Sequence, residues 1–147
     1  MISLSDRRDY FNRYLSKLEG ADRRNDIKGL ANTCPSCGYP TLNERCAWHI
    51  CSICFWEDDG QDDKDADKVC GGPNSDYSLT QHRSEWEKNL NEIKKMNSEV
   101  GKHLRRIDEL INLDNKSDIP EILDLVKNIS DWFLNERLSK GKNAKIV

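Results

Sequence analysis

Apolar side chains recur at the spacing of an α-helix near the start of the chain and again beyond residue 78, whereas the residues between have no such period. Residues 3–18 are expected to form an amphipathic helix, and residues 21–33 a linker. The apolar face of this helix consists of Tyr10, Phe11, Tyr14, Leu15 and Leu18.

A second helical region is expected to begin at Ser78, because the sequence Ser78-Leu-Thr-Gln81 has the form of a capping box. Apolar residues then follow at steps of three and four as far as Ile111. One long helix fits this pattern, and a break near Gly101 fits it equally, because glycine in a helix interior costs about 1 kcal/mol relative to alanine. The repeat over residues 86–111 allows either a coiled-coil homodimer or packing within the chain.

A last helix is expected after Ser117 or Asp118, with Pro120 in its first turn. Its buried stripe would consist of Ile122, Val126, Ile129 and Phe133, with Trp132 beside it. Between the helical regions, two short apolar runs at residues 41–42 and 47–50 lie on either side of a polar turn. These runs indicate a small β-hairpin.

Composition narrows the class of protein. Of the 147 residues, 36% are hydrophobic and 33% are charged, which suits a modest core with much exposed helix. The first residues are charged and no run of 18 apolar residues occurs, so neither a secretory signal nor a membrane span is expected. A cytoplasmic location follows as the default. Six cysteines in a reducing compartment indicate metal binding or redox chemistry.

Four of these cysteines form two Cys-x-x-Cys pairs that are separated by 13 residues. They are Cys34, Cys37, Cys51 and Cys54. Two residues between ligands allow a tight turn to direct both thiolates at one ion, and four thiolates about 2.3 Å from zinc form a closed structural site. Structural Zn²⁺ is therefore the expected cofactor. Cys46 and Cys70 have no place in this pattern and are expected to be spare thiols.

Redox chemistry is the main competing interpretation, because Cys34-Pro-Ser-Cys37 resembles the active-site turn of a thiol oxidoreductase, in which the first sulfur lies at the start of a helix. Gly38 and Pro40 argue against a helix there. A cluster metal or a disulfide would also fit the cysteine pattern. Since four thiolates would leave no open position on zinc, no catalytic residue is expected.

The expected fold is thus α+β and mostly α, with a zinc-ribbon-like β-hairpin module flanked by an N-terminal helix and C-terminal helices. Three regions follow from it. Residues 1–33 form the N-terminal helix and linker, residues 34–77 the cysteine-rich zinc-binding module with an acidic loop, and residues 78–147 the helical region.

Four motifs of the middle region occur in a fixed order. They are Cys34-Pro-Ser-Cys-Gly-Tyr-Pro-Thr-Leu42, Ile50-Cys-Ser-Ile-Cys-Phe-Trp-Glu-Asp-Asp59, Gly71-Gly-Pro-Asn74, and Ser78-Leu-Thr80 with Arg83. Together they resemble the bacterial cysteine-rich CPCC domain family over residues 34–86. The resemblance implies a small zinc-binding protein that uses the same four cysteines, and immunity to a toxin is a role it suggests. Ser36 departs from the family motif, which has a further cysteine there.

Acidic residues are concentrated in the acidic loop (residues 57–67), where seven carboxylates stand against one lysine. They are Glu57, Asp58, Asp59, Asp62, Asp63, Asp65 and Asp67. Such a loop repels nucleic-acid phosphates and attracts cations or basic protein surfaces. With Trp56, and Phe55 beside it, as an apolar anchor, it is a candidate surface for a basic partner protein. A solvated loop without a partner, and core packing of Phe55 and Trp56 against the zinc site, are the alternatives. Its start resembles an EF-hand loop, but Lys68 replaces the glycine and Asn74 the bidentate glutamate.

The sequence therefore favours a non-catalytic zinc-binding protein whose acidic module mediates protein–protein interaction, with neutralisation of a bacterial toxin as its specific form. Two different functions stay open. One is an enzyme that uses a thiol or a metal ion held by the acidic loop. The second is a nucleic-acid-binding zinc ribbon, which the negative charge of the module disfavours.

Overall fold

The computed structural model describes residues 2–15 and 32–140, and within these ranges the predicted α+β, mostly helical fold is confirmed. Most of the linker expected at residues 21–33 lies outside the described residues, as does the end of the first expected helix. The elements are α1 (Leu4–Leu15), β1 (Asn32–Thr33), β2 (Pro40–Leu42), η3 (Asp63–Asp65), η4 (Gly72–Asn74), α2 (Leu79–Lys94), α3 (Glu99–Leu113), η5 (Lys116–Asp118) and α4 (Ile119–Lys140).

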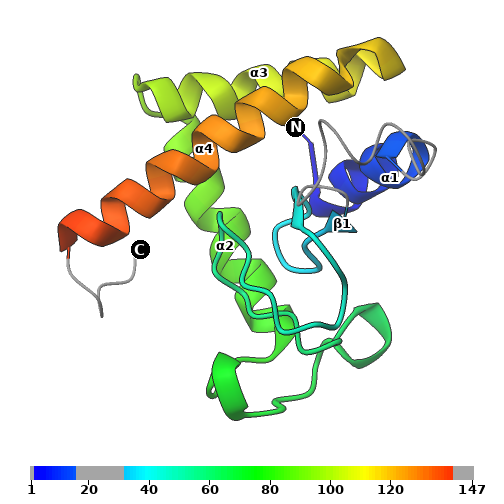
Figure 1. Cartoon of the computed structure of the whole chain (residues 1–147), viewed down its shortest axis with the longest axis vertical. Helices are drawn as coiled ribbons and strands as arrows, with labels where there is room; N and C mark the ends of the chain where they lie inside the picture. Colours follow the sequence, from blue (N-terminus) through cyan, green and yellow to red (C-terminus); the bar gives the residue numbers. More distant parts are fainter. Residues whose placement is uncertain (1, 16–31, 141–147) are drawn as a thin grey trace.

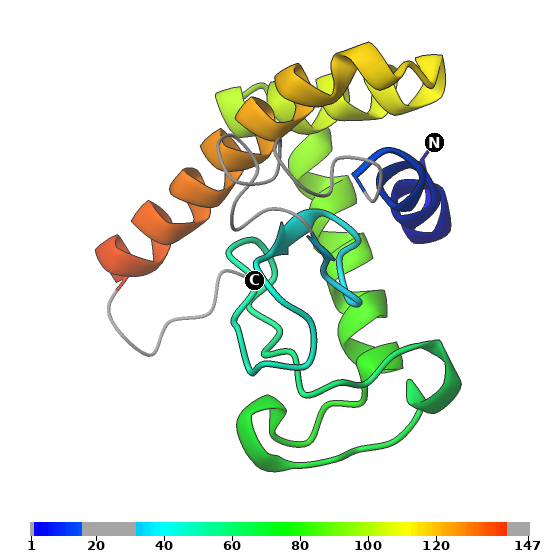
Figure 2. The ribbon, with the colours of Figure 1, turned by 45° about the vertical axis from the view of Figure 1, so that its right-hand side comes forward.

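The helices form a frame around the cysteine-rich module. Helices α3 and α4 lie side by side, and α2 runs away from them (Figure 1). The module lies against α2, with α1 on one side and the second half of α4 on the other, as the turned view also shows (Figure 2). One continuous core joins the two parts, since Ile53 and Trp56 of the module are buried together with Leu90 and Phe133 of the helices.

The second helical region is divided into two helices. The capping box predicted at Ser78 and Gln81 is present at the start of α2. The break falls at residues 95–98, where the Ser98 side chain caps α3, and not at Gly101. Gly101 lies in the first turn of α3, where a Cβ would come within 2.5 Å of the Met96 carbonyl oxygen. Glycine is needed there for the close approach of α3 to the end of α2.

The apolar repeat of residues 86–111 is buried within the chain. Its buried members are Trp86, Leu90, Val100, Leu104, Ile107 and Ile111. Packing within the chain, one of the two interpretations of this repeat, is therefore observed. A single helix over the whole segment is not formed. The side chains on which a coiled-coil homodimer would depend are buried in the core of the chain.

The last helix has the predicted buried stripe. In α4 the side chains of Ile122, Val126, Ile129 and Phe133 are buried, and Trp132 is half-buried. Although α4 has 22 residues, neither it nor any other helix in the described ranges is long and apolar enough to cross a membrane.

The predicted β-hairpin is wrong in its pairing. The two apolar runs do not pair with each other. Instead β2 pairs with β1, which occupies the end of the expected linker, and Ile50 forms an isolated antiparallel bridge with Glu57. Each Cys-x-x-Cys turn reverses the chain within a few residues, so the flanks of that turn are the nearest partners for backbone hydrogen bonds.

Candidate metal centre

The two Cys-x-x-Cys turns have the same backbone form. We call them the first knuckle (residues 34–38) and the second knuckle (residues 51–55). The Gly38 N–H donates to the Cys34 carbonyl at 2.9 Å, and the Phe55 N–H donates to the Cys51 carbonyl, also at 2.9 Å. Gly38 and Phe55 both have a positive φ, +82° and +65°. The repetition brings two equivalent pairs of sulfur atoms face to face.

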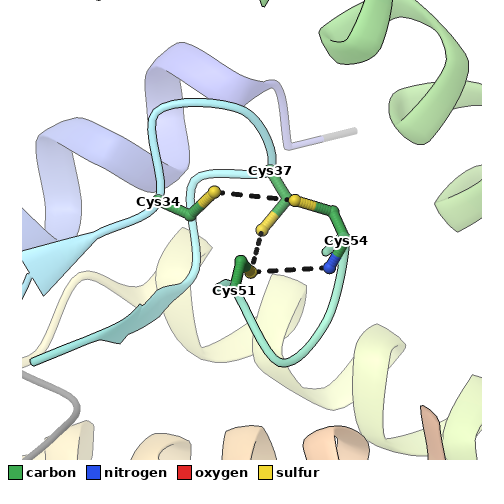
Figure 3. A group of neighbouring side chains, drawn as sticks. All are labelled: Cys34, Cys37, Cys51 and Cys54. Carbon is green, nitrogen blue, oxygen red and sulfur yellow. Dashed lines mark hydrogen bonds between the residues drawn. The ribbon is translucent and has the colours of Figure 1, made fainter. Parts of the chain in front are cut away.

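The four sulfur atoms meet at one point between the knuckles (Figure 3). The Sγ atoms of Cys34 and Cys54 are 3.5 Å apart, those of Cys37 and Cys51 are 3.6 Å apart, and all four lie within 4.8 Å of one another. Four sulfurs around one zinc ion at about 2.3 Å would be about 3.8 Å apart. The spacing therefore fits one tetrahedral metal ion, and no other group of potential ligands that could hold a metal occurs within the described residues.

Several donors point at the Cys51 sulfur and favour its negative form. Thr41 Oγ1 donates to Cys51 Sγ at 2.9 Å, and the backbone N–H groups of Ile53 and Cys54 approach the same sulfur at 3.4 Å. Burial raises the pKa of Cys37 well above its usual value. Burial also opposes ionisation of Cys51, but hydrogen bonds from the other three thiols and from Thr41 outweigh it and lower the Cys51 pKa. Metal binding requires thiolates of this kind.

The site is enclosed by protein. Each of the four cysteines is at most 1% exposed. The first knuckle continues into β2 and not into a helix. Both features suit a metal ion with a full set of protein ligands, whereas a reactive thiol needs access and a helix N-terminus or a nearby cation.

Arg7 of α1 fixes the first knuckle from behind. This side chain is completely buried, and its Nε donates to the Cys37 carbonyl oxygen at 2.9 Å. Its guanidinium forms a two-pronged ion pair with Glu87 of α2 and lies over the Tyr39 ring. Arg7 was not identified from the sequence, where it is one of several basic residues in an amphipathic helix.

Helix α2 holds the outer side of the first knuckle. Arg83 Nε donates to the Pro35 carbonyl oxygen at 2.8 Å, and Ser36 Oγ hydrogen-bonds to Nδ1 of His82. Ser36 occupies the position at which the resemblance leads one to expect a further cysteine. Its side chain is engaged with a helix, and the four remaining cysteines complete the cluster without it.

The second knuckle is held mainly by aromatic packing. The Phe55 ring lies edge-on to the rings of Trp86 and Phe133, each at a centroid distance of 6.3 Å. The Asn74 side chain accepts from the Glu57 N–H at 3.0 Å and donates to the Glu57 carbonyl at 2.8 Å. This pair of bonds explains the Gly71-Gly-Pro-Asn74 motif, which places Asn74 beside the segment that follows the second knuckle.

Two residues predicted to lie on the partner-binding surface are buried, so that part of the prediction is wrong. Trp56 and Asp58 have no exposed surface. Asp58 Oδ2 accepts from Arg45 Nε and from the Cys46 N–H, each at 2.8 Å. A carboxylate beside the second knuckle therefore orders the chain between the knuckles, and Trp56 belongs to the core.

Arginines engage the middle of the acidic loop. Asp62 accepts from Arg8 at 2.9 and 3.0 Å and from Arg45 at 3.0 Å, while Asp63 accepts from Arg83 at 2.8 Å. Burial opposes ionisation of Asp62, but the hydrogen bonds from Arg8, the Asp63 N–H and Arg45 outweigh it and hold the pKa well below the usual range. These partners were not predicted, because they lie far from the loop along the chain.

Of the remaining acidic residues of the loop, some accept hydrogen bonds from nearby groups and some are exposed to solvent. Asp65 accepts from the Asp62 N–H in a capping box at η3, and Asp67 accepts from Thr80 Oγ1 at 2.6 Å. Glu57 and Asp59 are half-buried, whereas Asp63 and Asp67 are exposed. In the described residues the loop therefore forms no calcium-type cluster of converging carboxylates.

The two cysteines outside the Cys-x-x-Cys pairs take no part in the cluster. Cys46 and Cys70 are exposed, and neither forms a disulfide.

Fold and site together define a cysteine-rich module that is braced by helices and whose four buried sulfurs could hold one metal ion. The family model for "Cysteine-rich CPCC" matches residues 32–107, which is about half of the chain. The chain therefore belongs to the cysteine-rich CPCC family. Searches of curated proteins and of solved structures returned no significant match.

Proposed function

We propose that this protein is non-catalytic and that one Zn²⁺ ion, bound by Cys34, Cys37, Cys51 and Cys54, organises it for binding another protein. The observation that supports the metal most directly is the convergence of four buried sulfurs within 4.8 Å. Zn²⁺ is the metal most often bound by four thiolates in a tetrahedron, with an iron–sulfur centre as the other common occupant. Four protein ligands would leave no position for water or substrate, so the role proposed for the ion is structural.

The metal is tested on the full chain prepared under reducing conditions. We expect one zinc per chain by elemental analysis, and we expect a chelator to remove the cooperative unfolding transition, because zinc binding and folding are coupled in such sites. Iron in place of zinc, or folding that is unchanged after complete removal of metal, would contradict the proposal. The matched variant Cys46→Ser changes a cysteine that lies outside the cluster, so it should bind the same amount of zinc.

Enzymatic use of the thiols is the competing function, and the burial of all four sulfurs argues against it. The discriminating measurement is the rate of alkylation in the zinc-loaded protein. We expect fast modification of the exposed Cys46 and Cys70 and slow modification of the four buried cysteines. Rapid alkylation of Cys34 would favour the enzyme. A cytoplasmic location is part of the proposal, because thiolates remain free to bind metal in a reducing compartment.

Binding to a basic partner protein is the second part of the proposal, now restricted to the carboxylates at the surface. Asp63 and Asp67 are exposed, and the side chain of Asp63 is 78% exposed even though it accepts from arginines. Charges at the rim of an interface accelerate association and make it dependent on salt. Neutralisation of a toxin, the specific form of this interaction, rests on the family resemblance alone.

The interaction is tested with the product of the neighbouring gene as the partner. We expect association to weaken as salt rises, and we expect the double substitution Asp63→Asn and Asp67→Asn to slow association. Glu99→Gln with Glu109→Gln makes the same charge change on exposed positions of α3 and should have no effect. Association that does not depend on salt would exclude the acidic loop as the interface.

A further inference from the structure

A cavity of about 450 Å³ opens beside the second knuckle. Its wall is formed by the knuckle itself, by the loop that carries Asn74, by α2 and by the C-terminal part of α4. Phe55, Tyr77 and Trp86 supply three aromatic rings to this wall, and Arg137 supplies a cation. Its size lies in the range of small-molecule sites, which combine apolar walls with a few polar groups.

Phe55 occupies a backbone position that favours glycine. The equivalent residue of the first knuckle is Gly38, where a Cβ would come within 2.7 Å of Leu4 Cδ1. The left-handed conformation costs a residue with a side chain on the order of 1–2 kcal/mol relative to glycine. The second knuckle nevertheless carries a large ring at φ +65°, and this ring is half-buried and lines the cavity. The ring thus contributes to the cavity wall as well as to the packing against α2 and α4.

Within the described residues, Arg137 lies across this ring without a carboxylate partner, and the negative group that interacts with it is the thiolate form of Cys54. Its Cζ is 3.1 Å from the centroid of the Phe55 ring, and its Nε is buried without a hydrogen-bond acceptor. Within residues 2–15 and 32–140, no carboxylate is paired with it. Glu85, the acid of the cavity wall, interacts with Tyr77, whose pKa it raises. Among the described residues, no carboxylate therefore competes with a ligand anion for this guanidinium.

We propose that this cavity binds a small aromatic carboxylate, with its ring against the aromatic wall that Phe55, Tyr77 and Trp86 form and its carboxylate on Arg137. Aromatic rings favour stacked or edge-on contacts with other rings, and a guanidinium binds a carboxylate through two parallel hydrogen bonds. This site is separate from the metal-binding role proposed above and adds a ligand to it. Because Cys54 also lines the cavity, a bound ligand would contact the module next to the metal centre.

The test uses the zinc-loaded full chain and 2-naphthoate as the probe. We expect a saturable change in the NMR signal of the Trp86 indole N–H. We further expect Arg137→Gln to weaken binding by about tenfold or more, because a charge-assisted bidentate contact is lost. Arg137→Lys, which keeps the charge but not the planar fork, should give an intermediate affinity.

Two controls make the result decisive. Arg106→Gln removes an arginine from the exposed surface of α3 and should leave the affinity unchanged. The uncharged 2-naphthamide should bind at least about tenfold more weakly than 2-naphthoate, since it lacks the anionic acceptor. The proposal is overturned if 2-naphthoate gives no saturable change at millimolar concentrations. It is equally overturned if folded, zinc-loaded Arg137→Gln, or 2-naphthamide with the wild type, retains full affinity.

Discussion

The two knuckles have one geometry but are held in place by different forces. Charged and polar side chains hold the first: Arg7 and Arg83 donate to its carbonyl groups, and Ser36 bonds to α2. The second is held mainly by the packing of Phe55 between α2 and α4, with one hydrogen bond between the hydroxyl groups of Ser52 and Ser130 at 2.7 Å. In each knuckle the two sulfurs point inward at the metal site. The outward carbonyl groups and the last residue of the knuckle need contacts from other parts of the chain. The rest of the chain can supply that support through hydrogen bonds or through packing.

The difference has a physical cause at one position. Side chains of α1 lie so close to Gly38 that a Cβ there would come within 2.7 Å of Leu4 Cδ1 and 3.3 Å of Arg7 Nε. At Phe55 an aromatic side chain instead extends from the knuckle and packs against Trp86 of α2 and Phe133 of α4. Substitutions in the two knuckles should therefore have different consequences, apart from substitution of the cysteines themselves.

Substitution of a ligand cysteine should have the same effect in either knuckle. We expect Cys34→Ser in the first knuckle and Cys51→Ser in the second to have the same large effect, because zinc needs both pairs and its binding contributes to folding. Elemental analysis should find little zinc, and the cooperative thermal transition should be lost. A stable, zinc-loaded form of either variant would mean that the knuckles are not equivalent ligands.

Removal of the buried arginine should have the next largest effect. Arg7→Met takes away the donor to the Cys37 carbonyl and leaves Glu87 without its partner, so we expect a loss of about 3 kcal/mol in the free energy of unfolding. Urea denaturation of the zinc-loaded protein measures it. The matched control is Arg13→Met on the same helix, where the ion pair with Asp114 is exposed and should contribute little. Equal effects of the two substitutions would contradict the role assigned to Arg7.

A methyl group at Gly38 should test the close approach of α1. We expect Gly38→Ala to cost about 2 kcal/mol or more, because the backbone strain of a positive φ adds to the contact with Leu4. Gly60→Ala is the control for strain alone, since its φ is +96° but a Cβ there would make only an ordinary contact, at 3.5 Å from Cys46 Sγ. The difference between the two variants in urea denaturation isolates the contact. A difference of zero would show that α1 can move aside.

Acid should weaken the link between the acidic loop and the first knuckle by a smaller amount. The Asp62 pKa is lowered by its arginine partners in spite of burial. Its contribution is thus complete above the unfolded pKa of about 3.9 and is lost as the pH falls through the lower folded value. Because Asp62 is partly exposed, we expect at most about 1 kcal/mol. The stability difference between Asp62→Asn and the wild type should stay constant down to about pH 4 and should shrink as the pH falls from about 4 toward 2. A constant difference over that window would contradict the assignment.

The predictable parts of this structure are those that depend on residues close together in the sequence. The ligand spacing of the four cysteines, the capping box at Ser78 and the stripe of α4 depend on residues a few positions apart. The partners of the arginines were not predictable, because Arg7 meets Glu87 and Arg8 meets Asp62 across long separations that only the folded chain defines. The hairpin was misplaced for a different reason, because each Cys-x-x-Cys turn reverses the chain and its own flanks pair. Asp58 was expected at the surface because its bonds to Arg45 and to the Cys46 N–H form only in the folded chain.

Zinc X-ray absorption spectroscopy of the purified full chain tests the central claim most directly. We predict a single zinc environment with four sulfur neighbours at about 2.3 Å and no oxygen or nitrogen bound to the metal. A spectrum that requires an oxygen or nitrogen ligand, or a protein that binds no zinc under reducing conditions, would contradict a closed structural site made by the two knuckles.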